Sequence, residues 1–311
     1  MNPYDLLLIG GPTGSGKSEL ACALAKKIDT EIVSVDSMAV YKHMDIGTAK
    51  QKNCGVKQHL VDILEPGEYF DAKIFEELAI KAIEDIKSRG KVPILCGGTY
   101  LYFQVLLYGL AYTPDPDWSL RKRLYYVAEK KGSAYLYQKL KTIDPLYARK
   151  IHPKDTRRIV RALEVFLQTG KPFSYFHRWQ SPRFSFLGFY IKRSWESLAK
   201  RIEQRVKRMV EEGLLDEVKS LLEMGFEKFL TSQQAIGYKE LVPYFKGEIT
   251  LENAIKRIIK NTKEYAKRQI RWFRKQGWIE VDMDRMTLQE GVDFILKVSS
   301  ETVQNLKAGL N

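Results

Sequence analysis

An eight-residue segment near the start of the chain, GPTGSGKS at 11–18, matches the pattern GxxxxGK[ST] and strongly constrains the fold. An apolar run at 4–9, typical of a buried parallel strand, precedes it, and a helical pattern at 18–27 follows it. Glycines in such a loop let backbone N–H groups surround a phosphate at the helix N-terminus, Lys17 adds positive charge, and the Ser18 hydroxyl suits Mg²⁺. We therefore predict a binding site for a diphosphate or a triphosphate, and we call residues 11–18 the P-loop.

Further apolar runs extend this start into an α/β core. Buried strands are predicted at 31–35 and 92–96, and an amphipathic helix at 73–89 that ends at Gly90. The order strand, helix, strand, helix, strand, with glycines after strands, is typical of a parallel sheet covered by helices. We therefore predict a P-loop NTPase-like α/β fold with a doubly wound parallel sheet at its core.

The pattern changes near residue 113, where prolines and aspartates alternate. From there to 182 the chain has helical patterns and no buried strand. This change predicts a helical insertion domain at 114–182, which interrupts a core made of 1–113 and 183–311.

Strand and helix patterns return after the predicted insertion. A strand is predicted at 184–191, and a short one near 279–281. Long amphipathic helices are expected around 195–224 and 250–276. These elements would complete the α/β core.

Charge, apolar runs and cysteine content limit the class of protein and the kind of partner. Lysine and arginine number 51 against 38 aspartates and glutamates, so the formal net charge of the 311-residue chain is +13. This excess excludes an acidic solvating protein and favours a polyanion such as nucleic acid. No run of 18 apolar residues is present, so we expect no membrane span. Cys22, Cys54 and Cys96 predict neither a disulfide framework nor a zinc site, which fits a cytoplasmic protein.

The kind of phosphate compound is left open by the P-loop alone. P-loop ATPases usually have a later buried strand that ends in aspartate, but the strand at 92–96 leads into Gly97, Gly98 and Thr99. The carboxylate that ends a core strand is Asp36. Because parallel strands expose their C-terminal ends at one crevice, Gly16, Asp36 and Thr99 should converge there. Three roles remain open for Asp36: an indirect Mg²⁺ ligand, a general base, or a residue that caps its own loop.

The predicted helix at 250–276 carries a basic stripe opposite its apolar side. The stripe is formed by Lys256, Lys260, Lys263, Lys267, Arg271 and Arg274. At 1.5 Å per residue it is about 27 Å long, enough to follow several phosphates of a polynucleotide. Residues 254–276 contain a single acid, Glu264, whereas a merely solvated face normally mixes in more. The stripe therefore favours nucleic acid over the alternative of a solvated face.

Smaller groups are compatible with the same kind of partner. One cluster on a predicted helix of the insertion is Arg157, Arg158 and Arg161. A second cluster on one helical face, which would equally suit a diphosphate, is Arg201, Arg205 and Arg208. The segment at 233–240 offers amides and a glycine for close approach to bases, and its alternative interpretation is a loop-to-helix junction.

Several segments together resemble the tRNA dimethylallyltransferase (tRNA isopentenyltransferase) family. They occur in order over residues 11–275: GPTGSGKS at 11–18, VDSMAVYKHMDIGTAK at 35–50, HLVDILEP at 59–66, GGTYLYFQ at 97–104, RRIVRALEVFLQTGKP at 157–172, QAIGYKEL at 234–241 and TKEYAKRQIRWFRK at 262–275. Ala39 and His43 stand where the family often has glutamine and glycine. A C-terminal zinc finger is absent from the sequence, which fits a bacterial form.

This resemblance implies transfer of a dimethylallyl group from dimethylallyl diphosphate to the exocyclic N6 amine of adenosine at tRNA position 37. It implies Asp36 as general base, Thr99 as a positioning group, and Arg205, or Arg201, as an aid to the departing diphosphate. Mg²⁺ would bind at Ser18. The implied diphosphate-binding residues are Gly11, Pro12, Thr13, Gly14, Ser15, Gly16, Lys17 and Ser18.

The resemblance also implies contacts with the tRNA anticodon stem-loop, with the insertion clasping the stem. The implied tRNA-binding residues are Asp36, Ser37, Met38, Ala39, Thr99, Arg121, Arg157, Arg158, Arg161, Gln234, Ala235, Ile236, Gly237, Tyr238, Lys239, Thr262, Lys263, Lys267, Arg268 and Gln269. The basic stripe overlaps this set through Lys263 and Lys267. No sequence feature suggests an oligomer, so a monomer is expected.

Other functions fit parts of the sequence. A P-loop ATP-dependent kinase explains the P-loop but neither the stripe nor the insertion. A nucleic-acid-dependent ATPase explains the stripe. However, the strand at 92–96 of this chain does not end in the aspartate that such enzymes have. A non-enzymatic RNA-binding protein leaves the intact Lys17-Ser18 pair unexplained.

Overall fold

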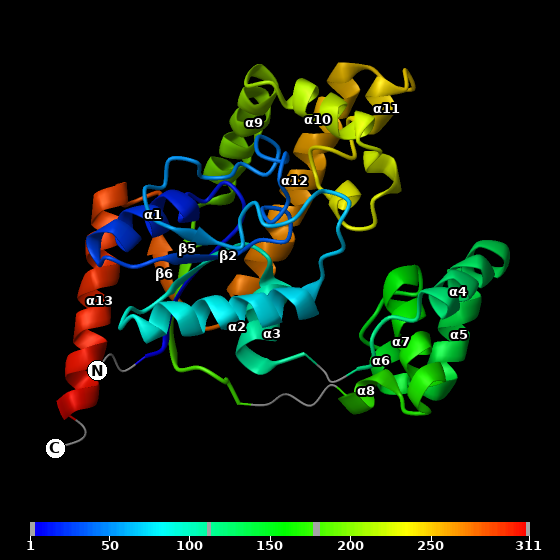
Figure 1. Cartoon of the computed structure of the whole chain (residues 1–311), viewed down its shortest axis with the longest axis horizontal. Helices are drawn as coiled ribbons and strands as arrows, with labels where there is room; N and C mark the ends of the chain where they lie inside the picture. The colour runs from blue at the N-terminus through cyan, green and yellow to red at the C-terminus, as the bar shows by residue number, and fades with distance from the viewer. Residues whose placement is uncertain (1–3, 111–112, 177–180, 309–311) are drawn as a thin grey trace. The chain divides into compact units, whose positions relative to one another are not determined.

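The computed structural model describes residues 4–110, 113–176 and 181–308. The chain divides into two compact units (Figure 1). We call the first, Met1–Leu107 with Pro182–Asn311, the core unit, and the second, Tyr108–Ser181, the helical unit.

A parallel sheet forms the centre of the core unit. Within the described residues its strands lie in the order β3-β2-β4-β1-β5-β6, and each neighbouring pair is parallel. Every residue of β1 is buried, as expected for a central strand covered on both faces. The predicted α/β class and doubly wound parallel sheet are confirmed. The strands are β1 Leu6–Gly10, β2 Ile32–Val35, β3 Gln58–His59, β4 Ile94–Gly97, β5 Phe186–Lys192 and β6 Ile279–Asp282.

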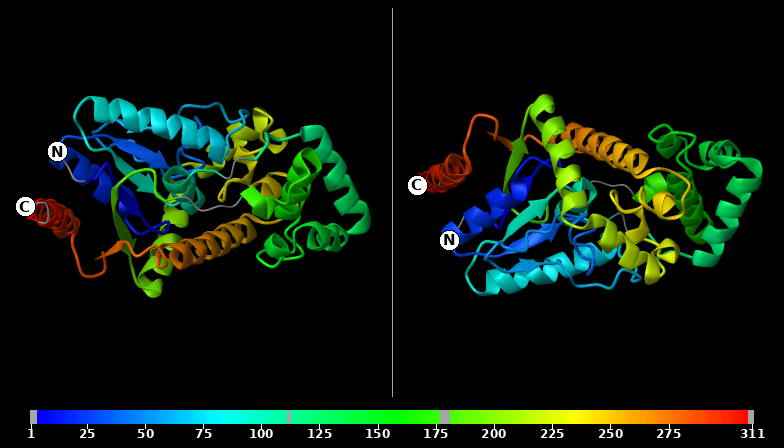
Figure 2. Two further views of the ribbon diagram at one scale, coloured as in Figure 1. Left: turned by 90° about the horizontal axis from the view of Figure 1, so that it is seen from below. Right: turned by 90° about the horizontal axis from the view of Figure 1, so that it is seen from above.

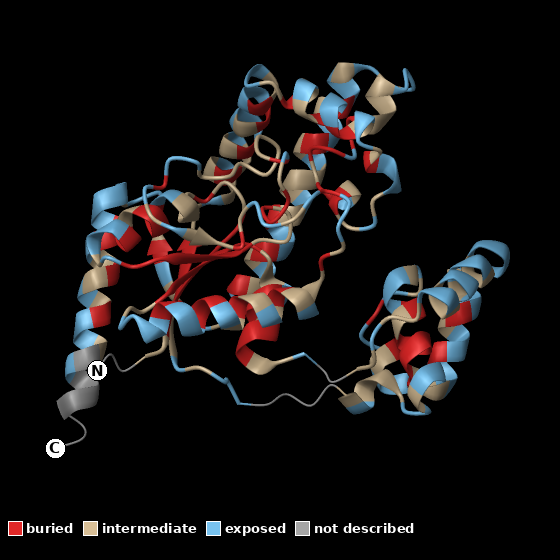
Figure 3. Ribbon diagram, in the orientation of Figure 1, coloured by how far each residue is buried: buried red, intermediate tan, exposed pale blue. Residues whose placement is uncertain are grey.

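Helices cover both faces of this sheet. On one face α1 and α13 share a hydrophobic cluster with the strands, and α2 lies on the other face (Figure 1). Leu198 and Ile202 of α9 pack on Ala266 of α12. Figure 2 shows these two helices next to each other. Figure 3 shows the sheet as the most deeply buried layer. The helices of the core unit are α1 Lys17–Lys27, α2 Ala72–Ser88, α3 Tyr100–Tyr108, α9 Trp195–Glu211, α10 Leu214–Glu223, α11 Val242–Phe245, α12 Leu251–Phe273 and α13 Leu288–Ala308.

Several details differ from the sequence-based expectation. Around 195–224 the structure has two helices, because Gly213 takes a φ of 103° and interrupts the α-helical backbone. Strand β3 and helix α13 were not predicted, and β3 is only two residues long. Within the described residues, no helix is both long and apolar enough to cross a bilayer.

The helical unit has its own small core. Leu136, Leu140, Ile159 and Leu163 form its centre. Asp117 starts α4 by accepting a hydrogen bond from the backbone of the first helical turn. The helices of this unit are α4 Trp118–Lys131, α5 Ser133–Ile143, α6 Pro145–Ala148, α7 Thr156–Thr169 and α8 Phe173–Phe176.

The cysteine prediction was wrong. Cys22 of α1 and Cys54 form a disulfide across 32 positions of sequence, whereas Cys96 is free and buried. The segment before β3 folds back onto α1, which brings the two α-carbons to 5.3 Å from each other. The sequence did not indicate this disulfide, because the pairing of Cys22 with Cys54 depends on a contact between distant parts of the chain.

Loss of this disulfide should destabilise the core unit. Closing a loop of this length restricts the unfolded chain and contributes roughly 3–4 kcal/mol. We expect the Cys22→Ser/Cys54→Ser variant to lose about that much free energy of unfolding in guanidinium titrations. The wild-type protein should lose a similar amount when reductant is added, and the double variant should not respond to reductant. Identical wild-type curves with and without reductant would contradict this prediction.

Candidate active site

The P-loop turns sharply between β1 and α1. Gly14 and Gly16 have positive φ angles of 82° and 95°, a backbone conformation that glycine adopts at little cost. A β-carbon at Gly11 would lie 2.6 Å from a backbone oxygen of β5. Helix α1 begins at Lys17, so its free N–H groups and the positive end of its dipole face the loop. The Lys17 ammonium donates to the carbonyl of Pro12 at 3.2 Å. The loop therefore has the geometry of an anion cradle.

Three arginines from outside the P-loop hold its backbone and side chains. They come from α9 and from the residue that follows β5. The hydrogen bonds run from Arg193 Nε to Ser15 O at 3.0 Å, from Arg201 Nε to Gly14 O at 2.8 Å and from Arg205 Nη1 to Thr13 Oγ1 at 3.0 Å.

The charges around the P-loop are predominantly positive. Burial lowers the pKa of Lys17, and the nearby Arg205 lowers it further, while Asp36 acts in the opposite direction. Burial also lowers the pKa of Arg205 and of Arg201. Cys96 adds no negative charge, because burial raises the pKa of its thiol to about 11. Lys17, Arg201 and Arg205 thus place three cations around the P-loop, which favours binding of a multiply charged anion.

Asp36 and Thr99 occupy the ends of β2 and β4, the two strands next to each other in the sheet. Asp36 Oδ1 accepts hydrogen bonds from the backbone N–H groups of Met38 at 2.8 Å and Ala39 at 3.2 Å. Thr99 Oγ1 accepts from the N–H of Ser37 at 3.2 Å. One carboxylate oxygen therefore caps the loop after β2, which is one of the three roles left open for Asp36.

Two residues of α12 also reach this site. Burial raises the pKa of Tyr265, whose hydroxyl hydrogen-bonds to Thr99 and whose anionic form would be repelled by Asp36. Gln269 is buried, with 1% of its surface exposed. Its Oε1 accepts from the N–H of Thr13 at 2.9 Å, and its Nε2 donates to the carbonyl of Gly98 at 2.9 Å.

With this geometry established, similarity to known proteins identifies the family. A family model described as IPP transferase matches residues 39–276. The tRNA dimethylallyltransferase of Aquifex aeolicus is 63% identical over 295 residues, which cover 94% of this chain and 97% of that protein. The chain belongs to the tRNA dimethylallyltransferase family. It is therefore a prenyltransferase that acts on tRNA with a prenyl diphosphate donor, and the predicted family is confirmed.

Solved structures agree with this assignment. A tRNA isopentenylpyrophosphate transferase from Bacillus halodurans is 38% identical, with a TM-score of 0.70, and the match covers 98% of this chain and 99% of that one. A eukaryotic dimethylallyltransferase acting on tRNA is 32% identical, with a TM-score of 0.81 and coverage of 96% and 79%. The kinase and ATPase alternatives are not supported by these comparisons.

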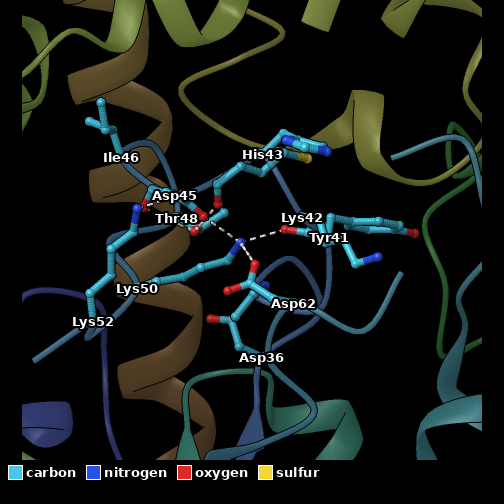
Figure 4. Close-up of polar contacts among 12 residues, drawn as sticks. Asp36, Tyr41, Lys42, His43, Asp45, Ile46, Thr48, Lys50, Lys52 and Asp62 are labelled. Carbon is cyan, nitrogen blue, oxygen red and sulfur yellow. Dashed lines mark hydrogen bonds and ion pairs between the residues drawn. The ribbon is translucent and has the colours of Figure 1, made fainter. Parts of the chain in front are cut away.

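Residues 40–50 form a tightly bonded loop beside Asp36 (Figure 4). Lys50 Nζ, almost fully buried, donates to Asp45 Oδ1 at 2.8 Å, to Asp62 Oδ1 at 2.5 Å and to the carbonyl of Tyr41 at 2.5 Å. These bonds tie the loop to the segment at 60–64. The hydrogen bonds of Lys50 therefore support the loop that follows the strand end carrying Asp36.

A second group of contacts holds the same loop from α10. Glu217 accepts hydrogen bonds from the backbone N–H groups of Asp45, Ile46 and Gly47, and from the Tyr238 hydroxyl at 2.6 Å. Burial raises the pKa of Tyr238, and the neighbouring Glu217 raises it further. A β-carbon at Gly47 would lie 2.4 Å from the Tyr238 ring, so the glycine admits this packing.

The predicted tRNA-binding residues differ widely in exposure. Partly buried members in and near the site are Asp36, Ser37, Met38, Thr99, Ile236, Thr262 and Lys263. Exposed members are Arg157, Arg158, Gln234, Lys239, Lys267 and Arg268. Buried members are Ala39, Ala235, Gly237, Tyr238 and Gln269. Among the buried members, Gln269, Gly237 and Tyr238 have hydrogen bonds to other parts of the protein.

In the helical unit, two predicted tRNA-binding arginines have internal partners. Glu164 is fully buried, and both Arg121 and Arg161 donate to its carboxylate, at 2.9 and 2.6 Å. Arg158 lies 3.4 Å from Asp155. The first two arginines therefore neutralise a buried acid in addition to any role toward RNA.

The basic stripe lies on α12 and is partly neutralised. Lys263 Nζ lies 2.5 Å from a carboxylate oxygen of Glu203 on α9, and Lys267 Nζ lies 3.0 Å from Glu264. Lys267 also lies over the Trp195 ring, 5.1 Å from its centroid. Glu203 of α9 and Glu264 of α12 itself thus reduce the like-charge repulsion within the stripe.

Sequence reasoning missed three residues of the site: Arg193, Tyr265 and Gln269 in its role at the P-loop. Arg193 directly follows β5 and also bonds Asp284 at 3.0 Å. Its place at a strand end, like that of Asp36, was a usable signal. Tyr265 and Gln269 gave no such signal, because their contacts span the length of the core unit.

Proposed function

We propose that the chain transfers the dimethylallyl group of dimethylallyl diphosphate to the exocyclic N6 amine of adenosine at tRNA position 37. The products are N6-dimethylallyladenosine and diphosphate. The observation that carries this proposal is the strongly cationic P-loop next to a strand-ending carboxylate, Asp36.

The P-loop would hold the diphosphate as a leaving group. Backbone N–H groups at the start of α1, Lys17 and the Arg205 guanidinium would neutralise the charge that grows on the bridging oxygen as the C–O bond breaks. The allylic carbon tolerates the accompanying positive charge. Ser15 supports this assignment, since its buried hydroxyl has no hydrogen-bond partner among the described residues and would suit a phosphate oxygen.

Asp36 would accept the proton of the adenine amine as the new C–N bond forms. Both backbone hydrogen bonds from Met38 and Ala39 go to Oδ1, which leaves Oδ2 as the proton acceptor. Thr99, fixed by Ser37 and Tyr265, would position the amine or the diphosphate.

Mg²⁺ would complete the diphosphate site. The Ser18 hydroxyl in the first turn of α1 is a hard oxygen donor of the kind that Mg²⁺ prefers, and it would hold the ion beside the diphosphate. When bound, the ion would neutralise part of the diphosphate charge.

The substrate would be the anticodon stem-loop of a tRNA, bound by a monomer in the cytoplasm. A base in a loop must leave its stack to enter a protein site, so unstacking of the target adenosine would be part of recognition. The exposed cations of α12 and of the helical unit are candidates for contacts with the RNA backbone.

One comparison tests this function. Unmodified tRNA is incubated with the enzyme and either dimethylallyl diphosphate or ATP, and the mass of the tRNA and the release of diphosphate or ADP are followed. We expect prenylated tRNA with the first donor and no ATP turnover. ATP hydrolysis or phosphoryl transfer without prenylation would overturn the proposal.

The basic stripe should contribute to tRNA affinity in a salt-dependent way. In a Lys263→Ala/Lys267→Ala/Arg271→Ala variant, the slope of log Kd against log salt concentration should fall by about two to three, because fewer counterions are released. Fluorescence titrations over a range of salt concentrations measure this slope. Lys297→Ala on α13 is the control. A slope equal to that of the control would mean that the stripe is a solvated face.

A further inference from the structure

The side chain of Gln269 joins α12 to two other parts of the site, the P-loop and the turn after β4. The side chains on either side of it in sequence, Arg268 and Ile270, are exposed and partly buried, whereas Gln269 is buried. Its amide spans the gap between the P-loop and the turn after β4. Thr13 N–H requires an acceptor and Gly98 C=O requires a donor, so one orientation of the amide satisfies both.

The first of these bonds acts on the diphosphate site. Thr13 is held at two atoms, its backbone N–H by Gln269 and its hydroxyl by Arg205 at 3.0 Å. A shift of Gln269 would therefore move the P-loop backbone together with the guanidinium proposed to act on the leaving group.

The second bond acts on the acceptor side of the same site. Gly98 directly precedes Thr99, whose hydroxyl accepts from Ser37, the residue after Asp36. A β-carbon at Gly98 would lie 2.3 Å from Gln269 Nε2 and 3.3 Å from the Gly11 carbonyl. The three segments are therefore in direct contact at this point, with no room for an added atom.

The helix that carries Gln269 also carries exposed cations. Lys267 and Arg268 lie within two residues of it on the solvent side of α12. Because backbone hydrogen bonds join successive turns of an α-helix, a displacement of Lys267 or Arg268 would also displace Gln269.

We propose that Gln269 is a positioning residue that couples tRNA binding on α12 to the geometry of the diphosphate site. This inference rests on the proposed function and differs from the implied role of Gln269 as a direct tRNA contact. Both ends of the amide are bonded inside the protein and only 1% of the residue is exposed, so the side chain is not presented to an RNA in this structure.

The test uses Gln269→Met, which keeps the length of the side chain and removes both hydrogen bonds. The matched control is Gln276→Met, since Gln276 follows the end of α12 and its Nε2 donates to the nearby carbonyl of Trp272 rather than to the P-loop. We expect the single-turnover rate of prenyl transfer to fall about a hundredfold, the cost typical of a misplaced reacting group. The Kd for tRNA should stay within about twofold of wild type and the control should be unchanged.

A second readout measures the coupling itself. Pyrophosphate affinity is determined by calorimetry with and without unmodified tRNA. In the wild-type enzyme tRNA should tighten pyrophosphate binding by about fivefold or more, and in Gln269→Met this effect should disappear. Gly98→Ala, whose β-carbon would displace the intact Gln269 amide, should reproduce both changes and serves if Gln269→Met does not fold.

The outcomes separate the two proposals. Loss of tRNA affinity in Gln269→Met with an unchanged single-turnover rate would make Gln269 a tRNA contact and overturn the inference. An unchanged rate, tRNA affinity and coupling would overturn it as well. Absence of prenyl transfer by the wild-type enzyme would instead contradict the proposed function.

Discussion

Replacing Asp36 with asparagine should lower the rate of prenyl transfer about a thousandfold, within the range expected for loss of a general base. Asparagine retains an oxygen that can accept the hydrogen bonds from Met38 and Ala39, so the loop after β2 should remain capped. It cannot accept the proton of the adenine amine at neutral pH. Single-turnover assays with saturating tRNA and dimethylallyl diphosphate measure the effect.

A matched Asp36→Ala variant separates catalysis from capping. Alanine removes the cap as well as the base, so it should lose the same activity and about 1 kcal/mol of stability in addition. The two variants should therefore differ in thermal unfolding but not in rate. Near-normal transfer by Asp36→Asn together with poor transfer by Asp36→Ala would assign Asp36 to the capping role alone.

Replacing Lys17 with methionine should have the second largest effect, a loss of roughly a hundredfold to a thousandfold in the rate of transfer. This is the range observed when one group that stabilises a developing anion is removed. The comparison is with Lys27→Met, at the exposed end of the same helix, which should behave as wild type. A Lys17→Met rate equal to that of the control would remove Lys17 from the chemistry.

In the absence of ligand, we expect Lys17→Met not to destabilise the fold. Burial lowers the pKa of Lys17, so the unfolded chain binds its proton more tightly than the ligand-free fold does. The charged ammonium therefore opposes folding below the folded-state pKa, and the stability contributed at this site rises with pH. Without ligand, Lys17→Met should be at least as stable as the wild-type protein at neutral pH.

In the presence of pyrophosphate, the wild-type protein should be more stable than Lys17→Met. A ligand that binds only the folded state at a hundred times its Kd adds about 2.7 kcal/mol to stability. The wild-type protein should gain this stabilisation in thermal unfolding and Lys17→Met should gain much less. Equal shifts in both proteins would contradict the assignment of Lys17 to the diphosphate.

The sheet and the P-loop were predictable from the sequence because their signals are local. Each central strand is a short apolar run, and the P-loop stands at the junction of the strand and helix that it connects. The position of Asp36 at a strand end followed from the rule that parallel strands share one functional edge. The segments that resemble the family supplied the reaction.

Other features depend on contacts between distant parts of the chain and were out of reach. The Cys22–Cys54 disulfide requires knowledge of how the segment before β3 folds onto α1. The hydrogen bond between Gln269 and Thr13 spans 256 positions. The periodicity of α12 places Gln269 on the buried face with Ala266 and Phe273, but it does not show that this face meets the P-loop. The stripe on α12 was visible in the sequence, but its partner Glu203 on α9 was not.

A crystal structure with tRNA and a non-hydrolysable thiolo analogue of dimethylallyl diphosphate tests the central assignment most directly. We expect the two phosphates on the P-loop between Lys17 and Arg205, with the allylic carbon directed toward an extruded adenine whose amine lies within hydrogen-bond reach of Asp36. Phosphates bound away from the P-loop, or an adenine that approaches no closer than a water molecule to Asp36 and the allylic carbon, would contradict it.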